Sequence, residues 1–115
     1  PSVVYASSAA VCGPAVDYGG DSVAVRDNDH HRPRTHYGVF KLANEGQARV
    51  FWQDHGVASV GLRPLTVYGV GREIGLTSAP TKAIKAALAG VPYEIPFTGW
   101  TSFNFIDDIV DIFVR

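Results

Sequence analysis

The sequence predicts an α/β fold built on a parallel βαβ unit. Residues 2–6 and 57–62 are short, continuous apolar runs, typical of strands that are buried on both faces of a parallel sheet. Residues 37–55, between these runs, carry a mixed apolar stripe at helical spacing and end before Gly56, which is a helix-terminating signal. Because the crossover of such a unit is right-handed in nearly all cases, both strands should finish at one edge of the sheet.

Length and composition are those of one globular domain that covers residues 1–115. The chain is 46% hydrophobic and 18% charged, and its net charge of −1 predicts neither a nucleic-acid partner nor an anionic membrane partner. The single cysteine, Cys12, excludes an internal disulfide and suits a reducing compartment, so we expect a cytoplasmic protein. No apolar run reaches the roughly 18 residues that a membrane-spanning helix needs.

The candidate chemistry begins with a tyrosine and a lysine on the predicted helix. Tyr37 and Lys41 are one turn apart, which places the phenol and the ammonium on the same face. A nearby fixed cation favours the ionised form of a phenol, so Lys41 is expected to prepare Tyr37 for general acid/base work. Ser7 and Ser8 follow the first strand, at the end that faces the ligand crevice in an open α/β sheet, where a serine hydroxyl can hold a substrate oxygen.

Each of these residues also has a purely structural explanation. Ser7 and Ser8 suit a strand-to-loop turn or a helix cap, and Thr35 suits the N-cap of the following helix. Glu45 lies one turn after Lys41 and is expected to pair with it. Arg63, at the end of the second strand, is expected to be structural.

Residues 13–35 are predicted to form a long loop, and such a loop inside a compact domain is usually functional or mobile. Its acidic and imidazole side chains invite a metal hypothesis. We favour a solvated loop without metal, because the spacing matches no standard site and adjacent histidines rarely point to one centre. The residues concerned are Asp27, Asp29, His30, His31 and His36.

Three segments resemble a known family. They are residues 3–13 (VVYASSAAVCG), 33–41 (PRTHYGVFK) and 62–72 (LRPLTVYGVGR). With them, nearly the whole chain resembles the extended short-chain dehydrogenase/reductase superfamily, in its NAD-dependent epimerase/dehydratase branch.

This resemblance implies a partial Rossmann-like parallel sheet plus part of the small substrate-binding lobe. It implies an NAD- or NADP-dependent oxidoreductase or isomerase acting on a hydroxyl-bearing, sugar or sugar-nucleotide-like substrate. By resemblance, Tyr37 takes the hydroxyl proton, Lys41 also bonds the nicotinamide ribose, and Ser8 orients the substrate oxygen. Ser7 becomes a wall of the nicotinamide pocket, and His30 and His31 in the covering loop are placed to touch the substrate.

The resemblance also assigns residues after the second strand. Pro64 and Leu65 border the cofactor, and Thr66 contacts the substrate at a position where many sugar-nucleotide enzymes carry asparagine. The family often has an arginine for a substrate phosphate where this chain has Thr101 and Ser102. The first departure weakens the case for a specific nucleotide-sugar substrate, and the second weakens the case for a phosphate-bearing one.

The carboxyl-terminal third is predicted to contain three elements. A helix at 81–88 is closed by Gly90 and Pro92 and belongs, by resemblance, to the small lobe. Residues 93–97 alternate like a short strand. Residues 103–110 resemble the family's strand-to-helix motif, in which Asp107 and Asp108 suit the helix start as caps that interact with the helix dipole.

Two hypotheses from different classes follow. The first is the catalytic half of such an enzyme. The second is a catalytically inactive, truncated fragment or association module, because the glycine-rich turn that anchors the cofactor pyrophosphate is missing and the chain lacks methionine. We expect weak NAD(P) binding by this chain alone. The first strand should have an open edge, which predicts a homo-oligomer or pairing with a missing N-terminal portion.

Overall fold

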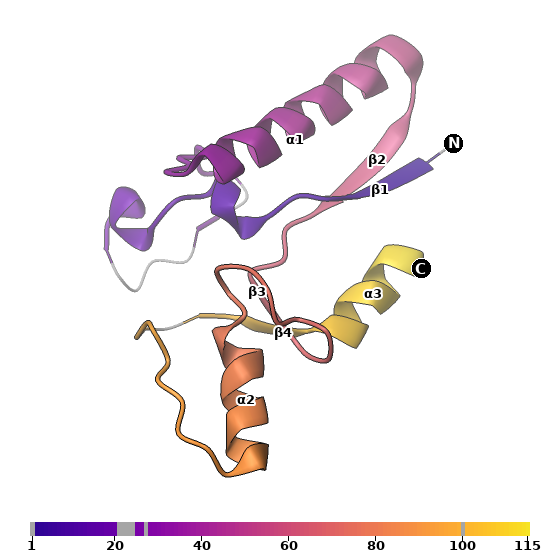
Figure 1. The fold of residues 1–115 in the computed structure, drawn as a ribbon. Helices are drawn as coiled ribbons and strands as arrows, with labels where there is room; N and C mark the ends of the chain where they lie inside the picture. Colours follow the sequence, from indigo (N-terminus) through magenta and orange to yellow (C-terminus); the bar gives the residue numbers. More distant parts are fainter. Residues whose placement is uncertain (1, 21–24, 27, 100) are drawn as a thin grey trace. The chain divides into compact units, whose positions relative to one another are not determined.

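The computed structural model describes residues 2–20, 25–26, 28–99 and 101–115. They belong to two compact units, Pro1–Pro64 and Leu65–Arg115, and each unit is described by itself (Figure 1).

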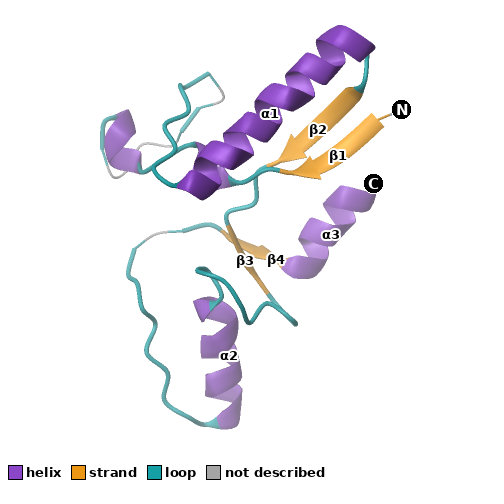
Figure 2. Ribbon diagram, turned by 45° about the horizontal axis from the view of Figure 1, so that its top comes forward, coloured by secondary structure: helices purple, strands orange, loops and turns teal. Residues whose placement is uncertain are grey.

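The first unit is a βαβ unit. Strand β1 (Ser2–Ala6) pairs in parallel with strand β2 (Ala58–Leu62), in a register that runs from Ser2 opposite Ala58 to Ala6 opposite Leu62. Helix α1 (His36–His55) connects them and lies along one face of the two strands (Figure 2). The predicted strand–helix–strand order is therefore confirmed, with boundaries that differ by one residue at the helix start and at the second strand.

Local signals fix both ends of α1. The Thr35 hydroxyl accepts a hydrogen bond from the backbone N–H of Gly38 at 3.0 Å, so the predicted N-cap is confirmed. At the other end Gly56 adopts a left-handed conformation with φ 64°, and its N–H donates to the carbonyl of Trp52 at 3.0 Å. Glycine adopts this conformation without the steric cost that a Cβ atom brings, which explains why the helix ends there.

The connection before α1 contains two short 3₁₀ helices, η1 (Ala9–Val11) and η2 (Ala15–Tyr18), and η2 lies in the segment that was predicted to be a loop. Asp17 in η2 pairs with the Arg34 guanidinium, and the Tyr18 hydroxyl donates to the carbonyl of His30 at 2.9 Å. These contacts hold the two ends of the loop together. Asp27, from the discarded metal hypothesis, lies outside the described residues.

One expectation about the sheet is wrong. The apolar run of β1 predicts a strand buried on both faces, yet Val3 is 46% and Val4 is 42% exposed. The reason is that β1 has one neighbouring strand among the described residues and a helix on one face. In this unit Val11, in η1, is fully buried.

The second unit contains two short parallel strands and two helices. Strand β3 (Thr66–Tyr68) was not anticipated, and it pairs with β4 (Phe103–Phe105), which leads directly into α3 (Ile106–Val114). Helix α2 (Ala79–Ala89) ends at Gly90, as predicted.

Two expectations for this unit are wrong. Residues 93–97 form no strand. Pro96 lacks an N–H donor for a ladder, and β4 pairs with β3 instead. The N-cap of α3 is Phe105, without a side-chain cap, so Asp107 and Asp108 occupy the first turn but do not cap it.

Candidate functional site

The candidate site is built where β1 ends. The backbone N–H of Ser7 donates to the Leu62 carbonyl at 2.7 Å, and that of Ala9 donates to the Pro64 carbonyl at 3.1 Å. The two chain segments therefore stay bonded beyond the end of the sheet, which fixes the backbone around Ser8.

Ser8 is the N-cap of η1. Its Oγ accepts a hydrogen bond from the backbone N–H of Ala10 at 3.1 Å, so the structural explanation for this serine is correct. The bond uses a lone pair of the hydroxyl oxygen, which leaves the O–H able to donate to another oxygen. Capping thus orients Ser8 without removing its capacity as a donor.

Tyr37 and Lys41 lie one turn apart near the start of α1. The Lys41 Nζ donates to the carbonyl of Ala6, the last residue of β1, at 2.7 Å. The same ammonium lies 5.5 Å from the centroid of the Tyr37 ring, and the Tyr37 side chain is 56% exposed. The structure therefore brings the phenol and the cation together at the carboxyl end of β1.

The start of α1 is close to η1 because Gly38 has no side chain. A Cβ atom at Gly38 would lie 2.3 Å from the carbonyl oxygen of Ala10 and 3.0 Å from Cβ of Pro33. The absence of that atom allows the helix turn that carries Tyr37 to pack against the segment that Ser8 caps.

A third polar group joins the two strand ends to α1. Glu45 accepts two hydrogen bonds from the Arg63 guanidinium, at 2.8 Å from Nε and 2.7 Å from Nη2. Ser7, only 3% exposed, donates its hydroxyl hydrogen to the same carboxylate at 2.5 Å. Sequence reasoning missed this cluster, and its expectation that Glu45 pairs with Lys41 is wrong.

The electrostatics of the cluster follow from these contacts. The Arg63 hydrogen bonds hold the pKa of Glu45 below its ordinary value of 4.5, and the Ser7 hydrogen bond adds to this against the opposing effect of burial. Glu45 raises the pKa of Arg63 in return. Both groups are therefore charged near neutral pH. The expectation that Arg63 is structural agrees with its position between strand and helix.

The remaining predicted site residues fall in different places. Pro64 ends the first unit, while Leu65 and Thr66 begin the second, so their position relative to Tyr37 stays a prediction. The Leu65 N–H donates to Asn104 Oδ1 at 3.1 Å. Thr66 is buried and its hydroxyl lies 2.9 Å from that of Thr101.

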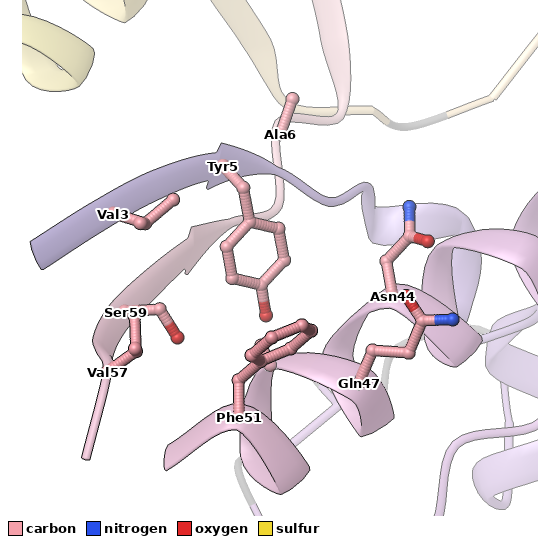
Figure 3. A pocket seen from close by; sticks show the side chains of 9 residues that line it. Val3, Tyr5, Ala6, Asn44, Gln47, Phe51, Val57 and Ser59 are labelled. Atoms are coloured by element: carbon pink, nitrogen blue, oxygen red, sulfur yellow. The ribbon is translucent and has the colours of Figure 1, made fainter. Parts of the chain in front are cut away.

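A cavity of about 430 Å³ lies elsewhere, between the strands and the middle of α1 (Figure 3). The Tyr5 and Phe51 rings meet across it, and none of Ser8, Tyr37 and Lys41 lines it. Its lining is mostly apolar. Within the described residues, no three His, Cys, Asp or Glu side chains are grouped to hold a metal ion. In the same part of the chain, no helix has both the length and the apolar character to cross a membrane.

Comparison with solved structures defines the fold class. The chain is similar to the UDP-N-acetylglucosamine 4-epimerase of Methanobrevibacter ruminantium, with a TM-score of 0.80 and 24% identity over 98% of this chain and 36% of that one. It is also similar to the UDP-glucuronic acid 4-epimerase of Bacillus cereus, solved with NAD, with a TM-score of 0.69 and 29% identity over 95% of this chain and 33% of that one. The predicted partial Rossmann-like fold is confirmed.

Sequence comparison gives the family. The profile of the NAD dependent epimerase/dehydratase family matches residues 1–115, so the chain belongs to this family, as the motifs predicted.

Comparison with two relatives shows what share of their length this chain covers. The chain is 44% identical over 66 residues to the ADP-L-glycero-D-manno-heptose-6-epimerase of Alkalilimnicola ehrlichii, a match that covers 57% of this chain and 19% of that protein. It is 35% identical over 118 residues to the uncharacterized protein MJ1055 of Methanocaldococcus jannaschii, covering 98% of this chain and 33% of that one. The chain thus spans at most about a third of these relatives.

Proposed function

We propose that this chain supplies the proton-transfer and substrate-orienting part of an NAD(P)-dependent epimerase/dehydratase-type oxidoreductase. The observation that carries the proposal is the position of Lys41, whose ammonium is anchored on the Ala6 carbonyl at 2.7 Å and lies 5.5 Å from the Tyr37 ring centroid. An exposed phenol beside a fixed cation, at the carboxyl end of a parallel strand, is suited to general acid/base catalysis.

The residues present fit one end of a dinucleotide. An ammonium has three N–H donors, and Lys41 uses one of them on Ala6, so two can bond the hydroxyls of a ribose. The pyrophosphate end finds no equivalent support, because no glycine-rich turn follows a strand in these 115 residues. When bound, NAD or NADP would supply the hydride acceptor.

Three side chains have distinct roles toward the substrate. Tyr37, as the phenolate, takes the proton of the substrate hydroxyl and becomes a neutral phenol, and the Lys41 ammonium stabilises the phenolate before this transfer. Ser8, held by its bond to Ala10, donates its O–H to the substrate oxygen. The substrate class that fits this chemistry and the epimerases named above is a hydroxyl-bearing sugar or sugar nucleotide. The reaction can end at oxidation or continue to epimerisation or elimination.

The test is turnover of UDP-N-acetylglucosamine, UDP-glucuronic acid and an ADP-heptose in the presence of NAD or NADP. Tyr37→Phe removes only the phenol hydroxyl and should lower kcat by about 10²- to 10⁴-fold, which is the usual contribution of a general acid/base. Tyr93→Phe makes the same chemical change in the second unit and should leave kcat unchanged. Equal rates for wild type and Tyr37→Phe would refute the assignment.

A second candidate function, self-association, is favoured by a specific observation. Strand β1 pairs with β2 alone among the described residues, and Val3 and Val4 on it are largely exposed. An apolar strand with an unpaired edge is a template for pairing with another chain. We propose that two copies associate through the free edge of β1.

Sedimentation measures this association directly. Wild type should form a dimer as concentration rises, and Val4→Pro should weaken it. The N–H of Ser7 points to β2, so by alternation along the strand that of Val4 points to the free edge, and proline removes this donor. Val70→Pro makes the same kind of change in an exposed turn outside the sheets and serves as the control. A monomer at every concentration would exclude the association function and leave the catalytic proposal untouched.

A further inference from the structure

The cluster around Glu45 lies one turn beyond Lys41 on the same face of α1. Both residues reach the same short stretch of chain. Lys41 donates to the carbonyl of Ala6, and Glu45 accepts from the hydroxyl of the next residue, Ser7. Arg63, the first residue after β2, closes the arrangement from the other strand. One face of the helix is thus bonded to both strand ends.

We propose that Glu45 is a positioning residue for Lys41, and through it for Tyr37. This inference rests on the proposed function, because it gives the position of the ammonium a catalytic purpose. Glu45 touches neither substrate nor cofactor in this proposal. It sets the rotation and the axial position of α1 against the strand ends.

The geometry explains why Glu45 can hold the helix in place. A bidentate arginine–carboxylate pair fixes orientation as well as distance, because two parallel bonds resist rotation. The Glu45 side chain is 15% exposed, which weakens competition from water. The Ser7 hydroxyl adds a third contact, so the carboxylate is held by the residues that directly follow β1 and β2.

The bond from Lys41 to Ala6, by contrast, cannot fix the helix by itself. A lysine side chain is flexible and its ammonium donates as a point charge, without a fixed plane. If the helix shifted by about 1 Å, the flexible lysine would spend more time in rotamers that do not reach the Ala6 carbonyl and the Tyr37 phenol would move, and displacements of this size are costly in catalysis. The anchor one turn later removes that freedom.

The test uses competition labelling of the folded 115-residue chain with acetic anhydride, read for each lysine by peptide mass spectrometry. The chain has three lysines, Lys41, Lys82 and Lys85, so the exposed Lys82 is an internal reference. In Glu45→Gln one of the two acceptor oxygens becomes an NH2 donor and the charge is removed, so the bidentate ion pair with Arg63 is lost. Acetylation of Lys41 relative to Lys82 should rise about fivefold, because the charge-assisted bond to Ala6 is populated less often.

The matched control is Asp111→Asn, which breaks the exposed pair between Asp111 and Arg115 in the second unit. It should leave the ratio of Lys41 to Lys82 unchanged. An unchanged ratio in Glu45→Gln, with its helical circular dichroism retained, would overturn the proposal. If Glu45→Gln loses that signal, Arg63→Lys decides instead, by the same ratio, since it keeps the charge but not the bidentate geometry.

The labelling ratio tests the positioning role of Glu45, and turnover tests the proposed enzyme function, so either proposal can be refuted without the other. With a UDP-sugar that turns over in the assay above, Glu45→Gln should lower kcat about tenfold with KM unchanged, the pattern of a disturbed transition-state geometry. A raised labelling ratio without turnover in wild type would retain the positioning role and reject the proposed enzyme function. A lowered kcat in Glu45→Gln, with no change in the labelling ratio, would reject the positioning role.

Discussion

Replacing Gly38 by alanine tests the packing that brings the candidate catalytic residues together. The new Cβ atom would lie 2.3 Å from the Ala10 carbonyl oxygen, so η1 and the first turn of α1 must separate by about 1 Å to reach ordinary contact. Overpacking of this kind costs about 1–3 kcal/mol, and the better helix propensity of alanine offsets about 0.5–1 kcal/mol of it. We therefore expect a net loss of about 1–2 kcal/mol in the free energy of unfolding.

Gly46→Ala, in the same helix, is the matched control because a Cβ atom there meets nothing within 4 Å. It should stabilise the chain by about 0.5–1 kcal/mol through helix propensity alone. In thermal unfolding followed by far-UV circular dichroism, Tm should fall by about 4–15 °C for Gly38→Ala and rise for Gly46→Ala. If both variants gained stability, the close approach of α1 and η1 would be refuted.

Two further predictions concern the ends and the middle of α1. Thr35→Ala removes the cap of Gly38 and should lower the free energy of unfolding by about 0.5–2 kcal/mol in urea denaturation, whereas Thr35→Ser should retain most of it. The depressed pKa of Glu45 means that its contribution to stability is present above the ordinary value of 4.5 and is lost as the pH falls through the lower folded-state value. The stability difference between wild type and Glu45→Gln should therefore shrink as the pH falls from about 6 to 3, and a constant difference would contradict the assignment.

The first unit was largely predictable because its signals are local. Apolar runs mark β1 and β2, Thr35 and Gly56 mark the ends of α1, and a parallel pair connected by a helix has essentially one topology. The juxtaposition of Tyr37 with Lys41 follows from helical spacing alone. The short strand β3 was missed because three residues carry too little periodicity to be distinguished from a loop.

The predictions for the site that proved wrong concern contacts between residues that are distant in sequence. Helical spacing places Lys41 one turn from Glu45, so Lys41 was the expected partner. In the folded chain Glu45 pairs with Arg63 instead, whose guanidinium donates two hydrogen bonds to the carboxylate, whereas a lysine ammonium is a point charge without that geometry. The one feature of the sequence that pointed to this pair was the position of Arg63 immediately after an apolar strand. The burial of β1 was overestimated because an apolar sequence describes the preference of the strand, while burial depends on what packs against it.

The register of β1 with β2 also determines the order in which the first unit can fold. The two strands pair only after the chain between Ala6 and Ala58, including all of α1, has been brought into a closed loop, and such non-local pairing is slow. Helix α1 has local contacts and caps at both ends, so it can form earlier. During that interval both apolar strands lack their partner, and refolding yield should therefore depend on dilution more than on the final stability of the chain.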